Sequence, residues 1–156
     1  MLTAAVLLSA ILTRAALPLD AMTKPAPTLL DRLTSATRGL EFMSETDAPL
    51  EPFFVEISLR STLTGVARRI AKRGTRTPIR EIDFDDFFEP LTTPHEWDGP
   101  KERAAIDRYR RLQAMLKLYL WDLRVYRLGE VDVDIVVVGR TSEGDAAGFH
   151  TRALET

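Results

Sequence analysis

The C-terminal stretch Val125–Thr156 constrains the fold most, because it carries the longest β-branched apolar run of the chain and two strong turn signals. Its last residues alternate between two predicted strand faces, Phe149, Thr151 and Ala153 against His150, Arg152 and Leu154. Most chains fray at the C-terminus, so a strand that continues almost to the last residue would hold the terminal carboxylate in a fixed place. The pattern alone favours the simpler interpretation, a domain that ends in a strand.

The same stretch predicts a β-hairpin. Val125–Leu128 and Val131–Val138 flank a tight Gly-Glu turn. Asp132 and Asp134 would share one face of the second strand. Paired carboxylates could bind a metal ion or act as acid and base, but nothing else nearby completes such a site. We therefore interpret both aspartates as the solvent-facing side of an antiparallel strand whose apolar continuation enters a covered sheet.

Two helices are predicted by apolar residues at helical spacing. The first spans Leu29–Arg38, begins at a capping-box-like pair of Thr28 and Asp31, and ends before Gly39, where a left-handed residue is typical. The second spans Pro100–Tyr119 and carries an apolar stripe that would face a core. This stripe consists of Ile106, Tyr109, Leu112, Leu116 and Tyr119 or Leu120.

Shorter elements complete the pattern. We expect strands at Phe53–Leu59 and Ile79–Phe84, a helical turn at Asp85–Leu91, and a turn formed by Gly139 and Thr141–Gly148. A chain of 156 residues with 45% hydrophobic residues fits one domain with a packed core. The elements predict an α+β domain in which two main helices pack on a mainly antiparallel sheet.

The run TTPHEWD around Trp97 has the features of a helix start. Thr93 would be the N-cap, a proline takes the first helical position, and Glu96 follows three residues after the cap. Trp97 would then lie in a short surface turn, and Asp98 could cap the long helix. The indole could cover the core. If exposed, it would be a candidate binding anchor, because tryptophan supplies large contact area at little entropic cost.

Charged residues occur in blocks of one sign, although the formal net charge is only −2. Residues 41–56 contain acids but no base, residues 57–80 contain bases but no acid, and residues 81–98 contain acids but no lysine or arginine. The acidic blocks suggest a surface that faces a basic partner. The segment 60–80 lacks interleaved aromatic residues, so it is weak support for nucleic-acid binding. We expect it to be a mobile, solvent-facing insertion with a short helix around Val66–Lys72.

The residue inventory excludes most catalytic designs. The chain has no cysteine and only two histidines, His95 and His150, in different segments. Disulfides, thiolate zinc sites and cysteine nucleophiles are thereby removed. The sequence contains no phosphate-binding glycine loop, dinucleotide fingerprint or hydrolase motif. We predict that the chain is not an enzyme and has no cofactor of its own. The small net charge also predicts neither general nucleic-acid binding nor membrane binding.

Residues 1–21 are set apart from the fold. Their apolar run is too short and too interrupted by Arg14 to span a bilayer, and it lacks the positive start of a signal peptide. Met22 opens a polar segment, so we expect translation to begin there and residues 1–21 to be an over-extended reading of the gene. The predicted domain is 22–156, located in the cytoplasm. An atypical export signal at 1–21 is the alternative.

Three segments, in order, resemble the nuclease A inhibitor-like proteins, bacterial inhibitors of a sugar-non-specific, metal-dependent nuclease. They are RGLEFMSETDAPLEPF, DFDDFFEPLTTPHEWD and VYRLGEVDVDIVVVGRTSEGDAAGFHTRALET. The similarity covers about Leu29–Thr156, and segment 57–80 departs most from it. The residues MTK at Met22 also look like the N-terminus of this family. The resemblance implies an α/β/α sandwich and a one-to-one complex with the nuclease.

The resemblance also implies roles for individual residues. Thr156 would enter the nuclease active site and contact its divalent metal ion, with Glu155 in the same tail. Glu45 would interact with basic active-site residues, and Trp97 would belong to the contact surface. Oxygen ligands suit a Mg²⁺-type cation, and a glutamate forms charge-assisted hydrogen bonds with arginine or lysine. The acidic blocks would steer association with a basic DNA-binding surface.

Two other functions compete with this one. A nucleic-acid-binding or other interaction module would use the basic segment 60–80 and bind DNA or RNA by itself in a salt-sensitive way. An enzyme would use Asp132 and Asp134 and bind metal without a partner. In an inhibitor, the basic segment would repel a basic partner, so we place it away from the interface. Charge reversal of four cations tests that placement: Arg68, Arg69, Lys72 and Arg73.

Overall fold

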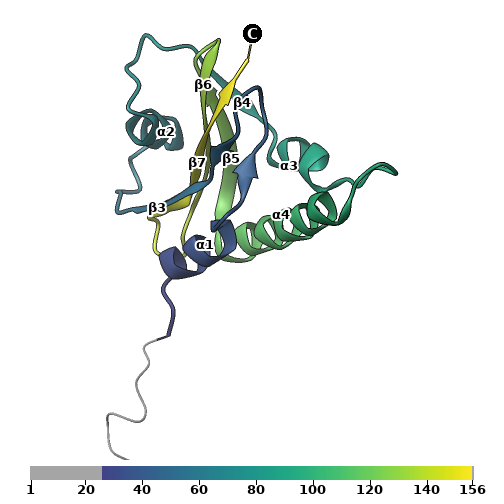
Figure 1. Cartoon of the computed structure of the whole chain (residues 1–156). Helices are drawn as coiled ribbons and strands as arrows, with labels where there is room; N and C mark the ends of the chain where they lie inside the picture. Colours follow the sequence, from purple (N-terminus) through teal and green to yellow (C-terminus); the bar gives the residue numbers. More distant parts are fainter. Residues whose placement is uncertain (1–25, 156) are drawn as a thin grey trace, which may run out of the picture.

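The computed structural model of the chain describes residues 26–155, which form a five-stranded antiparallel sheet, a two-stranded hairpin and four helices (Figure 1). The sheet order is β3-β7-β6-β5-β4. The strands are β1 (Glu41–Phe42), β2 (Ala48–Pro49), β3 (Glu51–Val55), β4 (Ile79–Ile82), β5 (Trp121–Leu128), β6 (Asp132–Arg140) and β7 (Ala146–Leu154). The helices are α1 (Leu29–Thr37), α2 (Leu63–Ala71), α3 (Phe84–Thr92) and α4 (Pro100–Tyr119). The segment 1–21 and Thr156 lie outside the described residues.

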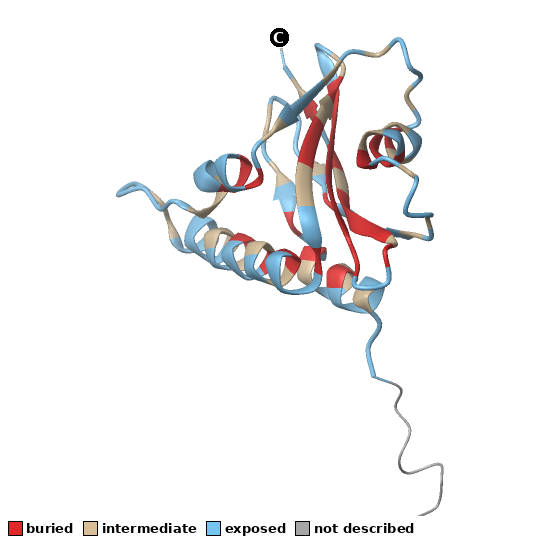
Figure 2. Ribbon diagram, turned by 180° about the vertical axis from the view of Figure 1, so that it is seen from behind, coloured by how far each residue is buried: buried red, intermediate tan, exposed pale blue. Residues whose placement is uncertain are grey.

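Helices cover both faces of the five-stranded sheet. α1, α3 and α4 pack on one face, and α2 packs on the other (Figure 1). The predicted α+β class is confirmed, and so is the α/β/α sandwich that the resemblance implied. Because both faces are covered, β6 is buried from Val133 to Arg140 (Figure 2), as its apolar run predicted. Gly139, expected in a turn, lies inside this strand.

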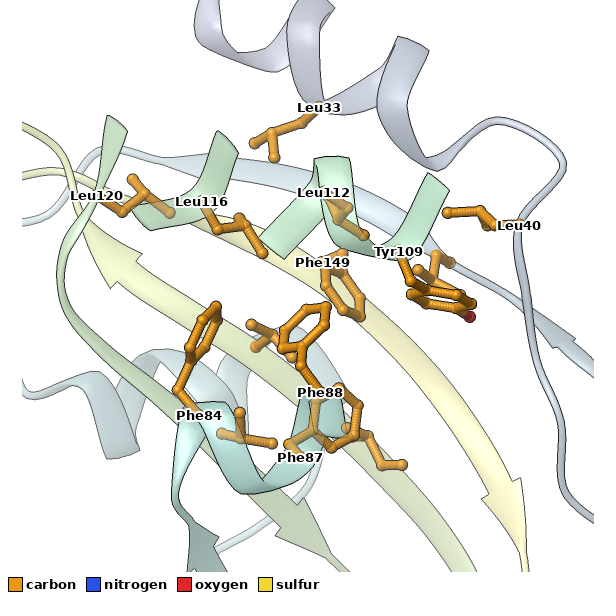
Figure 3. Packing of buried hydrophobic residues seen from close by; sticks show 14 of the residues in the cluster. Leu33, Leu40, Phe84, Phe87, Phe88, Tyr109, Leu112, Leu116, Leu120 and Phe149 are labelled. Carbon is orange, nitrogen blue, oxygen red and sulfur yellow. The ribbon is translucent and has the colours of Figure 1, made fainter. Parts of the chain in front are cut away.

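The larger core lies between the sheet and the three helices α1, α3 and α4 (Figure 3). Phe149 of β7 meets Phe88 of α3 edge to face, with ring centroids 6.3 Å apart. Leu33 of α1 belongs to the same cluster and is fully buried. The predicted stripe supplies the three buried residues of α4, Tyr109, Leu112 and Leu116, and Leu120, directly after the helix, is buried as well. Removal of these side chains from water is the main force that docks the helices on the sheet.

A second, smaller core lies under α2 and corrects the prediction for the basic segment. Four residues of α2 at helical spacing are buried against the sheet: Leu63, Val66, Ala67 and Ala71. The expectation of a solvent-facing insertion is therefore wrong, because the segment contains an amphipathic helix whose apolar side packs on this sheet face. The helix expected at Val66–Lys72 is present but begins earlier, since the Thr62 hydroxyl caps it by accepting the Gly65 N–H at 3.1 Å.

Local capping sets several boundaries where the sequence predicted them. α1 begins with a complete capping box between Thr28 and Asp31. Gly39 follows it with a φ of +73°, a left-handed conformation that costs glycine little. The β5–β6 hairpin turns at Gly129, whose φ is +103°. β7 shows the predicted alternation of buried and more exposed residues.

Two strand boundaries differ from the prediction for tertiary reasons. The strand expected at 53–59 ends at Val55, because β7 begins opposite this residue and later residues have no strand to pair with. The strand expected at 79–84 ends at Ile82. Asp83 caps α3 there by accepting a backbone N–H of the first helical turn at 3.0 Å.

Candidate functional site

The end of β7 lies at one tip of the sheet, beside the β5–β6 turn (Figure 1). The Glu155 N–H donates to the carbonyl oxygen of Val131 at 2.9 Å, and the Glu155 carboxylate pairs with Arg127 of β5. β7 is an interior strand between β3 and β6. Its pairing with β3 ends at His150, so the last residues of β7 pair with β6 on one side and contact the β1–β2 hairpin on the other. Thr156, the expected metal contact, lies outside the described residues.

Ser44 joins the loop of the β1–β2 hairpin to this tail. The Leu154 N–H donates to the Ser44 hydroxyl at 3.2 Å, and that hydroxyl donates to the Thr46 carbonyl at 2.7 Å. Glu45 lies between the two loop residues, and it is exposed. The structure thus brings the Glu45 loop and Glu155, which are far apart in the sequence, to the same tip of the molecule.

Two hollows flank Arg127 at this tip. One, of about 300 Å³, is lined by the β5–β6 turn and by Arg80, Arg127, Glu130 and Glu155. The other, of about 320 Å³, lies between the β1–β2 hairpin and α3, and its lining is mainly apolar. Met43 belongs to this second lining and is 75% exposed. The tip therefore offers both charged and apolar contacts next to the tail.

Trp97 lies apart from this tip. It belongs to the connection between α3 and α4, which projects from the molecule on a different side from the end of β7 (Figures 1 and 2). The indole is 80% exposed and stacks on the His95 ring with centroids 4.7 Å apart. Trp97 is therefore not a lid on the core, and its exposed ring has the form of a binding anchor.

The helix start expected at Thr93 is absent. The Thr93 hydroxyl donates to the Glu89 carbonyl at 2.7 Å, so this residue bonds back to α3 and caps no new helix. Asp98 accepts the His95 N–H at 2.6 Å and closes a turn around Trp97. Asp98 therefore does not cap α4, and our expectation that it would is wrong. That helix begins after Gly99 with a proline at its first position.

Asp134 is buried, which corrects our interpretation of the two aspartates of β6. Its side chain is 1% exposed, whereas that of Asp132 is 71% exposed. Arg73 donates to the Asp134 carboxylate at 2.6 Å, His150 bonds it at 2.7 Å, and Arg152 lies 3.4 Å away. The expected solvent-facing side of β6 is therefore an interior, because α2 and the loop after it cover this face of the sheet.

The contacts of Asp134 also set its protonation. Burial alone would raise the pKa of this carboxyl, but hydrogen bonds and positive charge from His150 and Arg73 more than offset that effect. Together they hold the pKa of Asp134 below its usual value. The charged carboxylate thus acts as an anchor that joins β6, β7 and the loop after α2.

Two arginines of the basic segment, Arg68 and Arg73, make contacts within the protein. Arg68 donates to the carbonyl oxygens of Gly74 at 2.6 Å and Thr77 at 2.9 Å. Arg73 pairs with Asp134. These two arginines fasten the loop after α2 to the helix and to the sheet. Charge reversal at either one would disturb the fold as well as any interface.

Other cations of this segment face solvent. Arg69 and Lys72 are exposed and make no ion pair within the described part of the chain. α2 lies on the opposite sheet face from the β1–β2 hairpin. The placement of the basic segment away from the interface stays a prediction. Arg80 differs, because it lines the hollow beside Glu155.

Three residues at the tip were not singled out from the sequence: Ser44, Arg80 and Arg127. The strand register provides a signal for Arg127. Arg127 pairs with Ile135 of β6, and Ile135 pairs with Thr151 of β7. Glu155, four residues after Thr151, therefore lies on the same sheet face as Arg127. No sequence signal indicates the bond of Ser44 to Leu154, because it joins a loop to a strand end that lies more than a hundred residues later.

Neither a metal-binding cluster nor a membrane-crossing helix is found between residues 26 and 155. In that range no three histidine, aspartate or glutamate side chains gather where they could hold a metal ion. The acid pair of β6 therefore forms no metal site with its neighbours. Likewise, the described helices include none with the length and apolar character that crossing a membrane requires.

Comparison with known proteins agrees with the fold and the segments described above. A family model described as nuclease A inhibitor-like protein matches residues 27–156. No curated protein matches the chain. The family match includes the β1–β2 hairpin, α2, the α3–α4 connection and the tail after β7. Because the match extends over most of its length, the chain belongs to the nuclease A inhibitor-like family.

Proposed function

We propose that this chain is a protein inhibitor of a metal-dependent, sugar-non-specific nuclease and has no enzymatic activity of its own. It would form a one-to-one complex in which the tail after β7 enters the nuclease active site. Family membership supports inhibition of a nuclease in general. The observation that carries the tail mechanism is the Ser44–Leu154 hydrogen bond, because it joins the tail to the loop that bears Glu45.

The loop and the tail offer the groups that a nuclease active site is built to bind. Glu45 would form charge-assisted hydrogen bonds with basic residues that otherwise hold the substrate phosphate. Thr156 would contact the divalent metal ion of the nuclease, because hard cations prefer carboxylate and hydroxyl oxygens. Occupation of both places would exclude DNA and RNA alike, which suits a target without sugar preference.

The support of the tail favours tight binding. The end of β7 pairs with β6, and the N–H groups of both residues that precede Thr156 donate hydrogen bonds to other segments. Binding of an already ordered segment loses less conformational entropy than binding of a frayed one. A rigid strand end is therefore a suitable device for delivering a terminal carboxylate.

Acidic side chains of the hairpin and α3 lie on the same sheet face as Glu155. The exposed acids of these elements are Glu41, Glu45, Asp47, Asp85, Asp86 and Glu89. A basic substrate-binding surface would be attracted to this face and would associate faster at low salt. Trp97, on its projecting connection, would form a separate second contact with the nuclease.

Inhibition of a purified metal-dependent, sugar-non-specific nuclease tests the proposal. The full chain and the same chain without Thr156 would be compared in the presence of Mg²⁺, with DNA and RNA as separate substrates. We expect strong inhibition by the full chain and a large loss without Thr156. Equal inhibition by both would refute the role of Thr156. No inhibition of any such nuclease by the full chain would refute the proposed function.

The role of Glu45 has a matched control. Glu143 is also an exposed glutamate, but it lies in the turn between β6 and β7, at the other end of the sheet. Glu45→Gln should weaken inhibition about ten-fold or more, since charge-assisted hydrogen bonds are the strong ones. Glu143→Gln should leave inhibition unchanged. Equal effects of the two substitutions would contradict a specific contact at Glu45.

A nucleic-acid-binding module remains the alternative, and the exposed pair Arg69 and Lys72 is the observation in its favour. It has less support because Arg68 and Arg73 of the same segment are used inside the protein. Binding of labelled DNA and RNA by the chain alone would separate the two functions. Tight, steeply salt-dependent binding would favour the alternative.

A further inference from the structure

Two arginines face each other at the base of the tail. Arg80 of β4 is directly opposite Arg127 of β5 in the antiparallel pairing, so their side chains lie on the same sheet face. Like charges in this relation destabilise a sheet. Both arginines line the hollow that also contains Glu155. The pair therefore creates a local positive field that favours an anion at this place.

Glu155 supplies that anion from within the chain. Its carboxylate pairs with the Arg127 guanidinium, and no other acid in the described part of the chain pairs with Arg127. The two side chains are 46% and 18% exposed, so water screens their attraction only in part. The backbone of Glu155 is also held, by the carbonyl oxygen of Val131 at 2.9 Å.

Leu154, the residue before Glu155, is held by Ser44 of the β1–β2 hairpin loop. The Ser44 hydroxyl accepts the Leu154 N–H at 3.2 Å while it donates to the Thr46 carbonyl at 2.7 Å. The hydroxyl is thus satisfied in both roles, and it ties the hairpin loop to the strand end. The last two described residues are consequently fixed by contacts from the hairpin loop, from β5 and from the β5–β6 turn.

We propose that Ser44, Arg127 and Glu155 form an internal clasp that positions the tail, and that Glu155 acts on Arg127 inside the inhibitor and not on the nuclease. This assignment differs from the role as a partner contact that we expected for Glu155. Its consequence for inhibition rests on the proposed function, whereas the clasp itself is a property of the free protein. The three are positioning residues, because they would act on the nuclease only by placing Thr156, the residue after Glu155.

The physical reason for such a clasp is the entropy of a chain end. A terminal residue samples many conformations unless side-chain or backbone contacts restrict it. Ordering it before the encounter leaves less to lose upon binding. The clasp also couples Glu45 to the tail through the adjacent Ser44, so both proposed contacts would reach the nuclease as one rigid unit.

Amide hydrogen exchange of the free, full-length protein tests the clasp without any nuclease. In the unmodified protein we expect slowed exchange of the amide protons of Leu154 and Glu155. The amide at position 155 should exchange several-fold faster in the Glu155→Gln variant, and the amide of Leu154 several-fold faster in the Ser44→Ala variant. Glu130→Gln and Ser142→Ala are the controls, since Glu130 lines the same hollow and Ser142 lies in the β6–β7 turn. Unprotected amides in the unmodified protein, or equal effects of the controls, would overturn the clasp.

A charge swap tests the internal role of Glu155 in the complex. Glu155→Gln should weaken nuclease inhibition roughly ten-fold by loosening the tail. The double variant Arg127→Glu with Glu155→Arg restores an opposite-charge pair and should recover most of the inhibition. Recovered amide protection without recovered inhibition would show that Glu155 contacts the nuclease directly and would overturn the assignment. Absence of inhibition by the unmodified chain would instead refute the proposed function and leave the exchange test intact.

Discussion

Asp134 has an unusual position for a carboxylate, since its side chain is almost entirely buried and bonded to residues from two other segments. Arg73 approaches from the loop after α2, and His150 from the neighbouring strand β7. Buried charges are tolerated when they are paired and hydrogen-bonded. Asp134 therefore holds α2 and β7 in fixed positions relative to β6.

Loss of the Asp134 charge should destabilise the protein. Asp134→Asn leaves Arg73 and His150 without their anion and should lower the free energy of unfolding by roughly 2–4 kcal/mol. Asp132→Asn is the matched control in the same strand, and its effect should stay below about 1 kcal/mol, because that side chain is mostly exposed. Urea unfolding at pH 7 measures both. Equal effects would contradict the anchoring role of Asp134.

The lowered pKa of Asp134 adds a pH dependence. The folded state holds its proton less tightly than the unfolded state, so the stabilisation is complete above the unfolded pKa of about 4. It is lost as the pH falls through the lower folded pKa. Unfolding curves of the Asp134→Asn variant should therefore be less sensitive to acid than those of the unmodified protein.

At the scale of elements, α2 is the part of the chain that gives β6 its second covered face. Its basic residues would have suggested a solvated segment, yet one side of the helix contributes four buried residues to the smaller core. Amphipathic helices of this kind derive most of their stability from tertiary packing and little from local propensity. α2 is thus a structural layer of the sandwich.

Two leucines in this region, one buried and one exposed, allow the contribution of α2 packing to stability to be measured. Leu63 of α2 is 4% exposed, whereas Leu59, in the turn before the helix, is 77% exposed. Leu63→Ala should lower the free energy of unfolding by about 2–3 kcal/mol through lost burial and a residual cavity. Leu59→Ala should have little effect. Thermal or urea unfolding measures both, and an unaffected Leu63→Ala variant would show that α2 is not docked on the sheet.

At the scale of the whole molecule, the exposed charges around the tail and those on α2 differ in sign, although α1 and α4, on the same sheet face as the tail, also carry exposed arginines and lysines. Exposed acids of the hairpin and α3 accompany the tail, while the exposed cations Arg69 and Lys72 lie with α2 on the opposite sheet face. A protein with a formal net charge of only −2 can therefore still concentrate acidic side chains locally, on the hairpin and α3 near the tail.

Charge reversal restricted to α2 tests this arrangement of charge. The variant Arg69→Glu with Lys72→Glu leaves the internally bonded arginines in place. It should change inhibition of the target nuclease less than about two-fold at low salt, because these side chains lie away from the tail. Glu41→Gln with Asp47→Gln should slow association several-fold under the same conditions and have less effect at high salt. Strong loss of inhibition from reversal on α2 would place this helix in the interface.

Sequence alone determined the features that depend on a few neighbouring residues. The capping box at Thr28, the turn at Gly129, the alternation along β7 and the extent of α4 were all predicted, because hydrogen bonds and steric limits within a few residues decide them. The family resemblance, carried by segments in order, correctly implied the sandwich. The functional roles of Glu45, Trp97 and Thr156 stay predictions.

The tertiary structure decided what lies against what. Asp134 was assigned to solvent because its own strand alternates, and only the position of α2 shows that this face is an interior. The bond from Leu154 to Ser44 and the pair of Glu155 with Arg127 join segments that are distant along the chain. Such contacts depend on how all the layers pack at once, and no local pattern records that.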